Sequence, residues 1–61
     1  MKPEEVKARR KSLGLTQVRL AVAVGVSLFS IRLWESGGGS PNPENLVKLK
    51  KALSVEEKSN G

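Results

Sequence analysis

The residue types in this chain decide which chemistry is open to it. None of the 61 residues is His or Cys. The absence of His excludes imidazole metal ligands and the commonest general base. The absence of Cys excludes thiolate metal ligands and disulfides. What remains is recognition by charge and hydrogen bonding, because 11 Lys and Arg residues face 6 Asp and Glu residues, for a formal net charge of +5. We expect a binding protein rather than an enzyme, without cofactor or metal, and nucleic acid is the default partner of so basic a small domain.

The stretch SLFSIRLWESG, residues 27–37, holds the best candidates for recognition. Its spacing is that of a short helix ending at Gly37, and Arg32 and Glu35 carry its only full charges. At about 100° per residue, four side chains point together toward the expected core: Ser27, Ser30, Ile31 and Trp34. Four others point outward: Leu28, Phe29, Arg32 and Leu33.

Arg32 is the best candidate for reading a base, because a guanidinium binds guanine O6 and N7 with two hydrogen bonds. A phosphate contact or a solvated charge is the alternative. Ser27 caps the helix and is also placed to reach a phosphate or a base edge. For Leu28, Phe29 and Leu33 two interpretations stay open: contact with thymine methyl groups or burial against another protein.

These residues are expected to lie on helices, since no segment alternates with the period of a strand. Helical patterns cover residues 3–13, 17–24, 28–36 and 43–53. Thr16, Ser27 and Asn42 are predicted to cap the last three. A possible fifth helix begins at Ser54, and residues 56–61 are expected to fray. We expect one all-α domain over residues 1–61, a compact bundle of four to five helices. No signal peptide or membrane-spanning run is visible.

The second and third helices are joined by a very short connection. Gly25 lies in the turn and Ala21 lies four residues before it. Two helices that cross steeply through a three- or four-residue turn need a glycine there and a small residue where they touch. The angle between them is predicted to be filled by apolar side chains: Leu20, Val24, Val26, Ile31 and Trp34. This spacing indicates a helix-turn-helix.

In order and spacing, the chain resembles the Cro/repressor-type helix-turn-helix family, also called the xenobiotic response element family. The matching residues extend from about residue 3 to 55: Leu13-Gly14-Leu15-Thr16-Gln17, Leu20-Ala21, Gly25-Val26-Ser27, Ile31, Trp34-Glu35-Ser36-Gly37, Pro41, Leu46 and Ala52-Leu53. The resemblance implies a lambda-repressor-like DNA-binding domain with its helix-turn-helix core at about 16–36. It further implies a phage or bacterial transcriptional regulator, a repressor, that binds double-stranded DNA with helix 27–36 in the major groove.

The same resemblance assigns further contacts to DNA. Gln17, in the first turn of the second helix, matches a phosphate-binding position of the family, and helix-start amides also suit a phosphate. Thr16 beside it is more a cap than a contact. Ser36 and Asn42 are candidates to hold the DNA backbone on the other side of the groove. Members of the family normally act as dimers on paired half-sites. The short fifth helix of this chain leaves little dimer surface, so we expect a homodimer on DNA only and a monomeric free domain. The bacterial cytoplasm is the expected compartment.

Arg10 raises a separate question, because helical spacing places it on the expected core face with Val6 and Leu13. A buried arginine needs a partner, and Glu35 is the only acid between Glu5 and Glu44. The family resemblance points to the same pairing. We therefore predict a structural Arg10–Glu35 salt bridge between the first and third helices.

Several outward positions depart from the family, which usually carries polar or charged residues there. They are Val18, Val22, Leu28, Phe29 and Leu33. Five apolar residues on one helical pair indicate a surface for another protein. The alternative hypothesis is therefore a protein-interaction module or antitoxin on the same fold.

Overall fold

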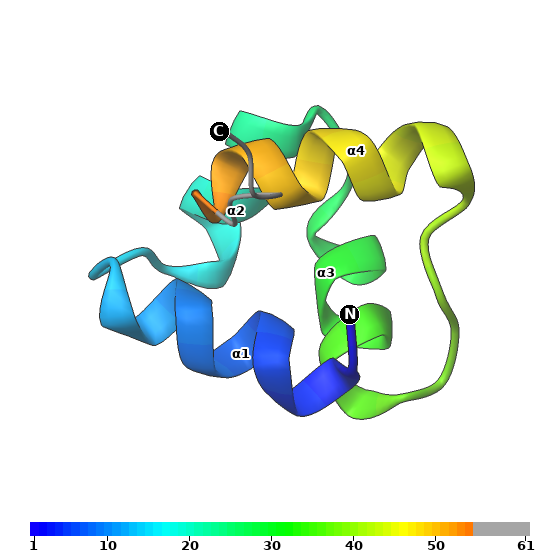
Figure 1. The fold of residues 1–61 in the computed structure, drawn as a ribbon, viewed down its shortest axis with the longest axis horizontal. Helices are drawn as coiled ribbons and strands as arrows, with labels where there is room; N and C mark the ends of the chain where they lie inside the picture. Colours follow the sequence, from blue (N-terminus) through cyan, green and yellow to red (C-terminus); the bar gives the residue numbers. More distant parts are fainter. Residues whose placement is uncertain (55–61) are drawn as a thin grey trace, which may run out of the picture.

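The computed structural model describes residues 1–54, and four α-helices organise them (Figure 1). They are α1 (Pro3–Ser12), α2 (Gln17–Val24), α3 (Leu28–Ser36) and α4 (Pro43–Ala52). The all-α prediction is confirmed. Helices α1 and α4 end one residue earlier than predicted, because Leu13 and Leu53 take the C-cap positions. The predicted fifth helix, apart from Ser54, and the predicted fraying of residues 56–61 lie outside the described residues.

The three predicted N-caps are confirmed, and each satisfies an amide that the first helical turn leaves without a partner. The Thr16 hydroxyl accepts from the Arg19 amide at 3.0 Å, and the Ser27 hydroxyl accepts from the Ser30 amide at 3.2 Å. The Asn42 side-chain oxygen accepts from the amide three residues later, at 2.8 Å. These local bonds fix where the helices begin.

The core lies where the four helices meet. Its buried apolar residues are Val6, Leu20, Ala21, Val24, Ile31, Trp34, Leu49 and Leu53. Helix α3 packs on α1 and α2, and α4 packs on α2 (Figure 1). Leu13 was predicted to face this core with Val6 and Arg10, and that prediction is wrong: Leu13 is 44% exposed. Helix α1 ends before it, so Leu13 no longer follows the helical spacing that buries the other two.

Gly25 forms the turn between α2 and α3 in the left-handed conformation, with φ 85° and ψ 34°. Its amide and the Val26 amide both donate to the Ala21 carbonyl, at 2.8 and 3.0 Å. The chain bends by 110° at this break, which is the steep crossing of a helix-turn-helix.

In the described part, no single helix is long and apolar enough to cross a membrane, and α2 and α3 have the required length and composition only as a bent pair.

Arg9 connects α1 to the C-terminal end of α4. Its Nη2 donates to the carbonyl of Ser54 at 2.8 Å and to the carbonyl of Leu53 at 3.3 Å. These carbonyls lie at the C-terminal end of α4, where a positive side chain also complements the helix dipole. This link was not predicted from the sequence, in which Arg9 is one of several basic residues on the first helix.

Candidate nucleic-acid interface

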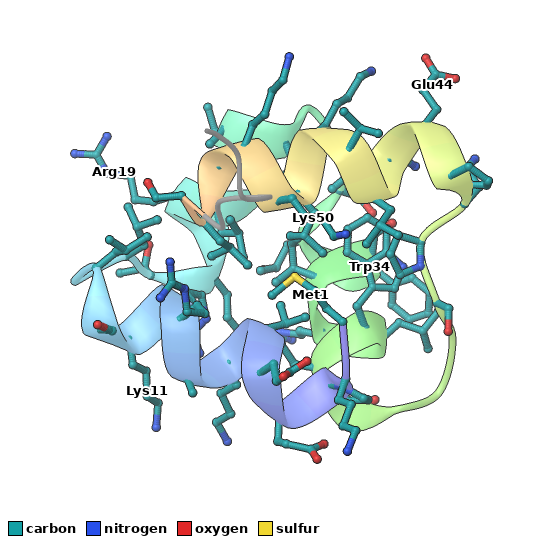
Figure 2. The ribbon with its side chains drawn as sticks, in the orientation of Figure 1. Met1, Lys11, Arg19, Trp34, Glu44 and Lys50 are labelled. Carbon is teal, nitrogen blue, oxygen red and sulfur yellow. The ribbon has the colours of Figure 1, made fainter. Side chains whose placement is uncertain are left out.

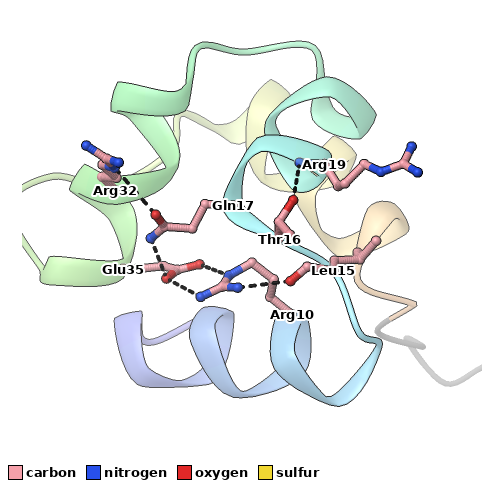
Figure 3. A network of polar contacts seen from close by, with 7 residues as sticks. All are labelled: Arg10, Leu15, Thr16, Gln17, Arg19, Arg32 and Glu35. Carbon is pink, nitrogen blue, oxygen red and sulfur yellow. Dashed lines mark hydrogen bonds and ion pairs between the residues drawn. The ribbon is translucent and has the colours of Figure 1, made fainter.

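A chain of polar contacts connects the interior of the molecule to the outer face of α3 (Figure 3). It begins at the expected pair of Arg10 and Glu35. The Arg10 Nε donates to Glu35 Oε2 at 2.6 Å, and its Nη2 donates to Oε1 at 3.1 Å. The two side chains are only 10% and 4% exposed. Two parallel bonds between buried groups fix α3 against α1 in both position and orientation.

Two further groups complete the surroundings of this pair. The Arg10 Nη1 donates to the Leu15 carbonyl at 2.9 Å, so the guanidinium also holds the loop before α2. Burial acts to raise the pKa of Glu35. Hydrogen bonds from Arg10 and Gln17 and the positive charges of Arg10 and Lys7 outweigh burial, so the pKa of Glu35 lies below its ordinary value. Glu35 is therefore charged at neutral pH.

Gln17 extends the network from the buried pair toward solvent. Its Nε2 donates to Glu35 Oε1 at 3.1 Å, and its Oε1 accepts from Arg32 Nε at 3.4 Å. Gln17, Arg32 and Glu35 were each singled out from the sequence, but their contacts with one another were not predicted. One signal was available, because residues 32 and 35 lie three apart on α3 and are therefore neighbours at the boundary between its outer and inner sides. The contribution of α2 depends on its angle to α3, which the sequence does not state.

The other predicted polar contacts lie at separate helix ends. Thr16, Ser27 and Asn42 are exposed and act as caps, and the Ser36 hydroxyl donates to the Leu33 carbonyl at 3.1 Å. Among residues 1–54, none of these four side chains hydrogen-bonds to Arg10, Gln17, Arg32 or Glu35. The hydroxyl of Ser27 also lies 3.2 Å from the hydroxyl of Ser30.

The predicted apolar outer face of α3 is smaller than expected. Phe29 is 70% exposed, as predicted, and Leu28 is half-buried. Leu33 was predicted to point outward, and that prediction is wrong, because it packs against the core. The connector between α3 and α4, residues 37–42, begins with three glycines and lies over Leu33. A Cβ added at Gly38 or at Gly39 would come within 2.9 Å of a Leu33 methyl carbon. The connector therefore covers Leu33, which a helical projection of α3 alone does not show.

Helix α2 presents the remaining apolar residues of the predicted face. Val18 and Val22 are 55% and 74% exposed, in agreement with their predicted outward direction.

Charged side chains surround the molecule on other sides; Lys11, Arg19 and Glu44 all point away from its body (Figure 2). In the described part of the chain, no three acidic residues cluster as metal ligands would.

Comparison with known proteins gives this geometry a context. A family model described as helix-turn-helix matches residues 6–58. A crystal structure of the P22 c2 repressor protein in complex with synthetic operator 9T superimposes with a TM-score of 0.86 at 44% identity. The match covers 88% of this chain and 82% of that one. This agreement confirms the predicted fold class.

Curated relatives show the same likeness in sequence. Repressor protein C2 of Salmonella phage P22 is 48% identical over 50 residues, which are 82% of this chain and 23% of that protein. The cryptic phage CTXphi transcriptional repressor RstR of Vibrio cholerae serotype O1 is 42% identical over 52 residues, which are 85% of this chain and 46% of that one. The regulator DicA of Escherichia coli is 42% identical over 50 residues, which are 82% of this chain and 37% of that one. The chain thus spans less than half the length of these relatives, and all three names denote transcription regulators or repressors rather than enzymes.

Proposed function

This chain belongs to the helix-turn-helix family, in its Cro/repressor type, and on that premise we propose that it binds operator DNA as the recognition domain of a phage or bacterial repressor. Helix α3 enters the major groove and the start of α2 rests on the backbone. The observation that carries this proposal is the close likeness to a repressor solved on its operator, with α3 exposing both Arg32 and Phe29.

The roles of the individual residues follow from their exposure and remaining hydrogen-bonding capacity. Arg32 contacts a base or a phosphate with its terminal nitrogens, and Gln17 keeps one N–H for a phosphate. Phe29, with half-buried Leu28 beside it, contacts thymine methyl groups. Thr16, whose hydroxyl accepts from the Arg19 amide, keeps its hydroxyl hydrogen for a DNA phosphate. Ser27 contacts a phosphate or a base edge through the hydroxyl that it also shares with Ser30. Ser36, at the end of α3, and Asn42, at the start of α4, contact the DNA backbone.

The proposed mechanism is steric. The domain occupies an operator and thereby blocks polymerase, without cofactor and in the bacterial cytoplasm. Two copies bind paired half-sites about one helical turn apart, as is usual for this architecture. The single domain over residues 1–61 supplies the recognition surface of each half-site.

A salt titration tests the proposal. Binding to a duplex selected from random DNA should weaken steeply as salt rises from about 50 to 200 mM, because phosphate contacts release counterions. A duplex of scrambled sequence is the control for specificity. Absence of binding to either duplex at low salt would contradict the proposed function, and equal binding to both would contradict sequence-specific recognition.

The second candidate function is a protein-interaction surface on the same fold, and the exposure of Val18, Val22 and Phe29 is the observation that favours it. Phe29→Lys separates the two. Lost DNA binding in a folded variant favours groove contact, whereas retained DNA binding with improved solubility favours a protein partner. Val47→Lys on α4, where the valine is 55% exposed, is the matched control.

A further inference from the structure

The contact between α2 and Arg32 assigns Gln17 a task beyond holding a phosphate, and this inference rests on the DNA-binding function proposed above. We infer that Gln17 is a positioning residue for Arg32. It holds the guanidinium by one nitrogen and so sets how much Arg32 contributes to affinity for the cognate site. The inference rests on two hydrogen bonds that link the recognition arginine to the buried ion pair.

The donor inventory of Arg32 shows why this contact suits recognition. A guanidinium has five N–H groups, one on Nε and four on the two Nη atoms. Gln17 takes the single N–H of Nε. The fork formed by both Nη atoms stays available, and such a fork matches guanine O6 and N7 or two phosphate oxygens. Gln17 therefore restrains the arginine at its base while leaving its reading end free, as Figure 3 shows.

The orientation of the Gln17 amide is dictated from both sides. Its nitrogen faces the Glu35 carboxylate, which only accepts, and its oxygen faces the Arg32 guanidinium, which only donates. A flipped amide would set oxygen against oxygen on one side and N–H against N–H on the other. Arg10 holds Glu35 in the interior. The Gln17 side chain is therefore fixed relative to the core of the protein.

The Arg32 bond is long at 3.4 Å, and Arg32 is exposed, so it adds little to folding stability. Its consequence lies in binding. A free arginine loses much rotamer freedom when it engages a base, and a side chain that is already restrained loses less. Removal of the Gln17 side chain should therefore reduce the contribution of Arg32 to affinity for the cognate site. This reduction comes in addition to any loss of a phosphate contact by Gln17 itself.

A double-mutant cycle tests this. Gln17→Met keeps the length of the side chain and removes both polar ends, and Arg32→Met removes the fork. Dissociation constants are measured for the parent chain, both variants and the double variant, on a duplex selected from random DNA. Fluorescence of the single buried Trp34 and circular dichroism establish that each variant is folded. The same cycle with Arg19→Met is the control, since the Arg19 side chain points away from Gln17 (Figure 3).

The expected result is coupling at one pair only. Arg32→Met should weaken cognate binding about tenfold in the parent chain. In the Gln17→Met background the same change should weaken binding by no more than about threefold. Arg19→Met should cost the same factor in both backgrounds. An equal cost of Arg32→Met in both backgrounds, or no cost in the parent chain, overturns the inference while DNA binding itself stands. Failure of the parent chain to bind any duplex overturns the proposed function.

Discussion

The two sides of α3 are built from different kinds of contact. The inner side is held by packing of Ile31 and Trp34 and by two bonds between Glu35 and Arg10, all of them shielded from water. On the outer side, Phe29 is 70% exposed and Arg32 makes one long bond, to Gln17. A recognition helix needs this asymmetry, because the inner side must fix the helix while the outer side keeps its capacity to bind DNA.

The largest effect is expected when the inner side loses its acid. Glu35→Ala leaves the buried Arg10 without its charged partner, which should lower the free energy of unfolding by about 3–5 kcal/mol. Urea denaturation followed by circular dichroism measures this loss. The control is Glu44→Ala, which breaks the exposed pair Glu44–Lys48, at 3.7 Å, and should cost at most about 0.5 kcal/mol. Equal stability of the two variants would show that the Arg10–Glu35 pair does not hold α3 in place.

A smaller loss is expected at the turn that aims α3. Gly25→Ala puts a side chain on a residue with φ 85°, which should cost about 1–2 kcal/mol from backbone strain. The added Cβ would meet nothing within 4 Å, so packing contributes no part of this cost. Gly25→Asn is the matched variant and should lose less, because asparagine tolerates the left-handed region. If both variants unfold at the same urea concentration as the parent chain, the strain argument is wrong.

Acid should weaken the inner side selectively, and by less than either substitution. The pKa of Glu35 is lower in the folded than in the unfolded chain, so the folded state binds fewer protons near that pKa. The resulting stability is present above the ordinary carboxyl pKa of about 4.3 and is lost as the pH falls through the lowered pKa. Burial opposes the lowering, which keeps the effect small.

The measurement compares unfolding of the parent chain with that of Glu35→Gln from pH 7 down to pH 3, by urea titration at each pH. The advantage of the parent chain should shrink at the acid end. A Glu44→Gln variant should follow the parent throughout, because Glu44 is exposed. An advantage that grows with acidity would contradict the direction of the Glu35 pKa shift.

Sequence reasoning succeeded best where local spacing decides the structure. The caps at Thr16, Ser27 and Asn42 depend on neighbouring residues, and each was correctly placed. The Arg10–Glu35 pair was accessible too, because helical spacing turned the arginine inward and few acids could meet it. The caps followed from residue types at the helix starts. The pair followed from the helical period and the few acids available, and the family resemblance pointed to the same pairing.

Contacts that depend on the relative placement of elements were not accessible in this way. Leu33 points outward on a projection of α3 alone, but the connector at Gly38 and Gly39 returns over it and joins it to the core. The bridge from Gln17 to Arg32 depends on the 110° bend between α2 and α3. The sequence names the residues of these contacts, and only the tertiary arrangement brings them together.

The smallest effect on stability is expected on the outer side, where the two aromatic residues of α3 offer a direct comparison. Phe29→Ala should change the free energy of unfolding by no more than about 0.5 kcal/mol, because the ring is 70% exposed. The same truncation at Trp34, which is 6% exposed, should cost about 3–5 kcal/mol. Urea denaturation of both variants measures the difference. If Phe29→Ala lowers the free energy of unfolding by more than about 1 kcal/mol, the outer side also stabilises the helix. The proposed difference between the two sides of α3 would then be wrong.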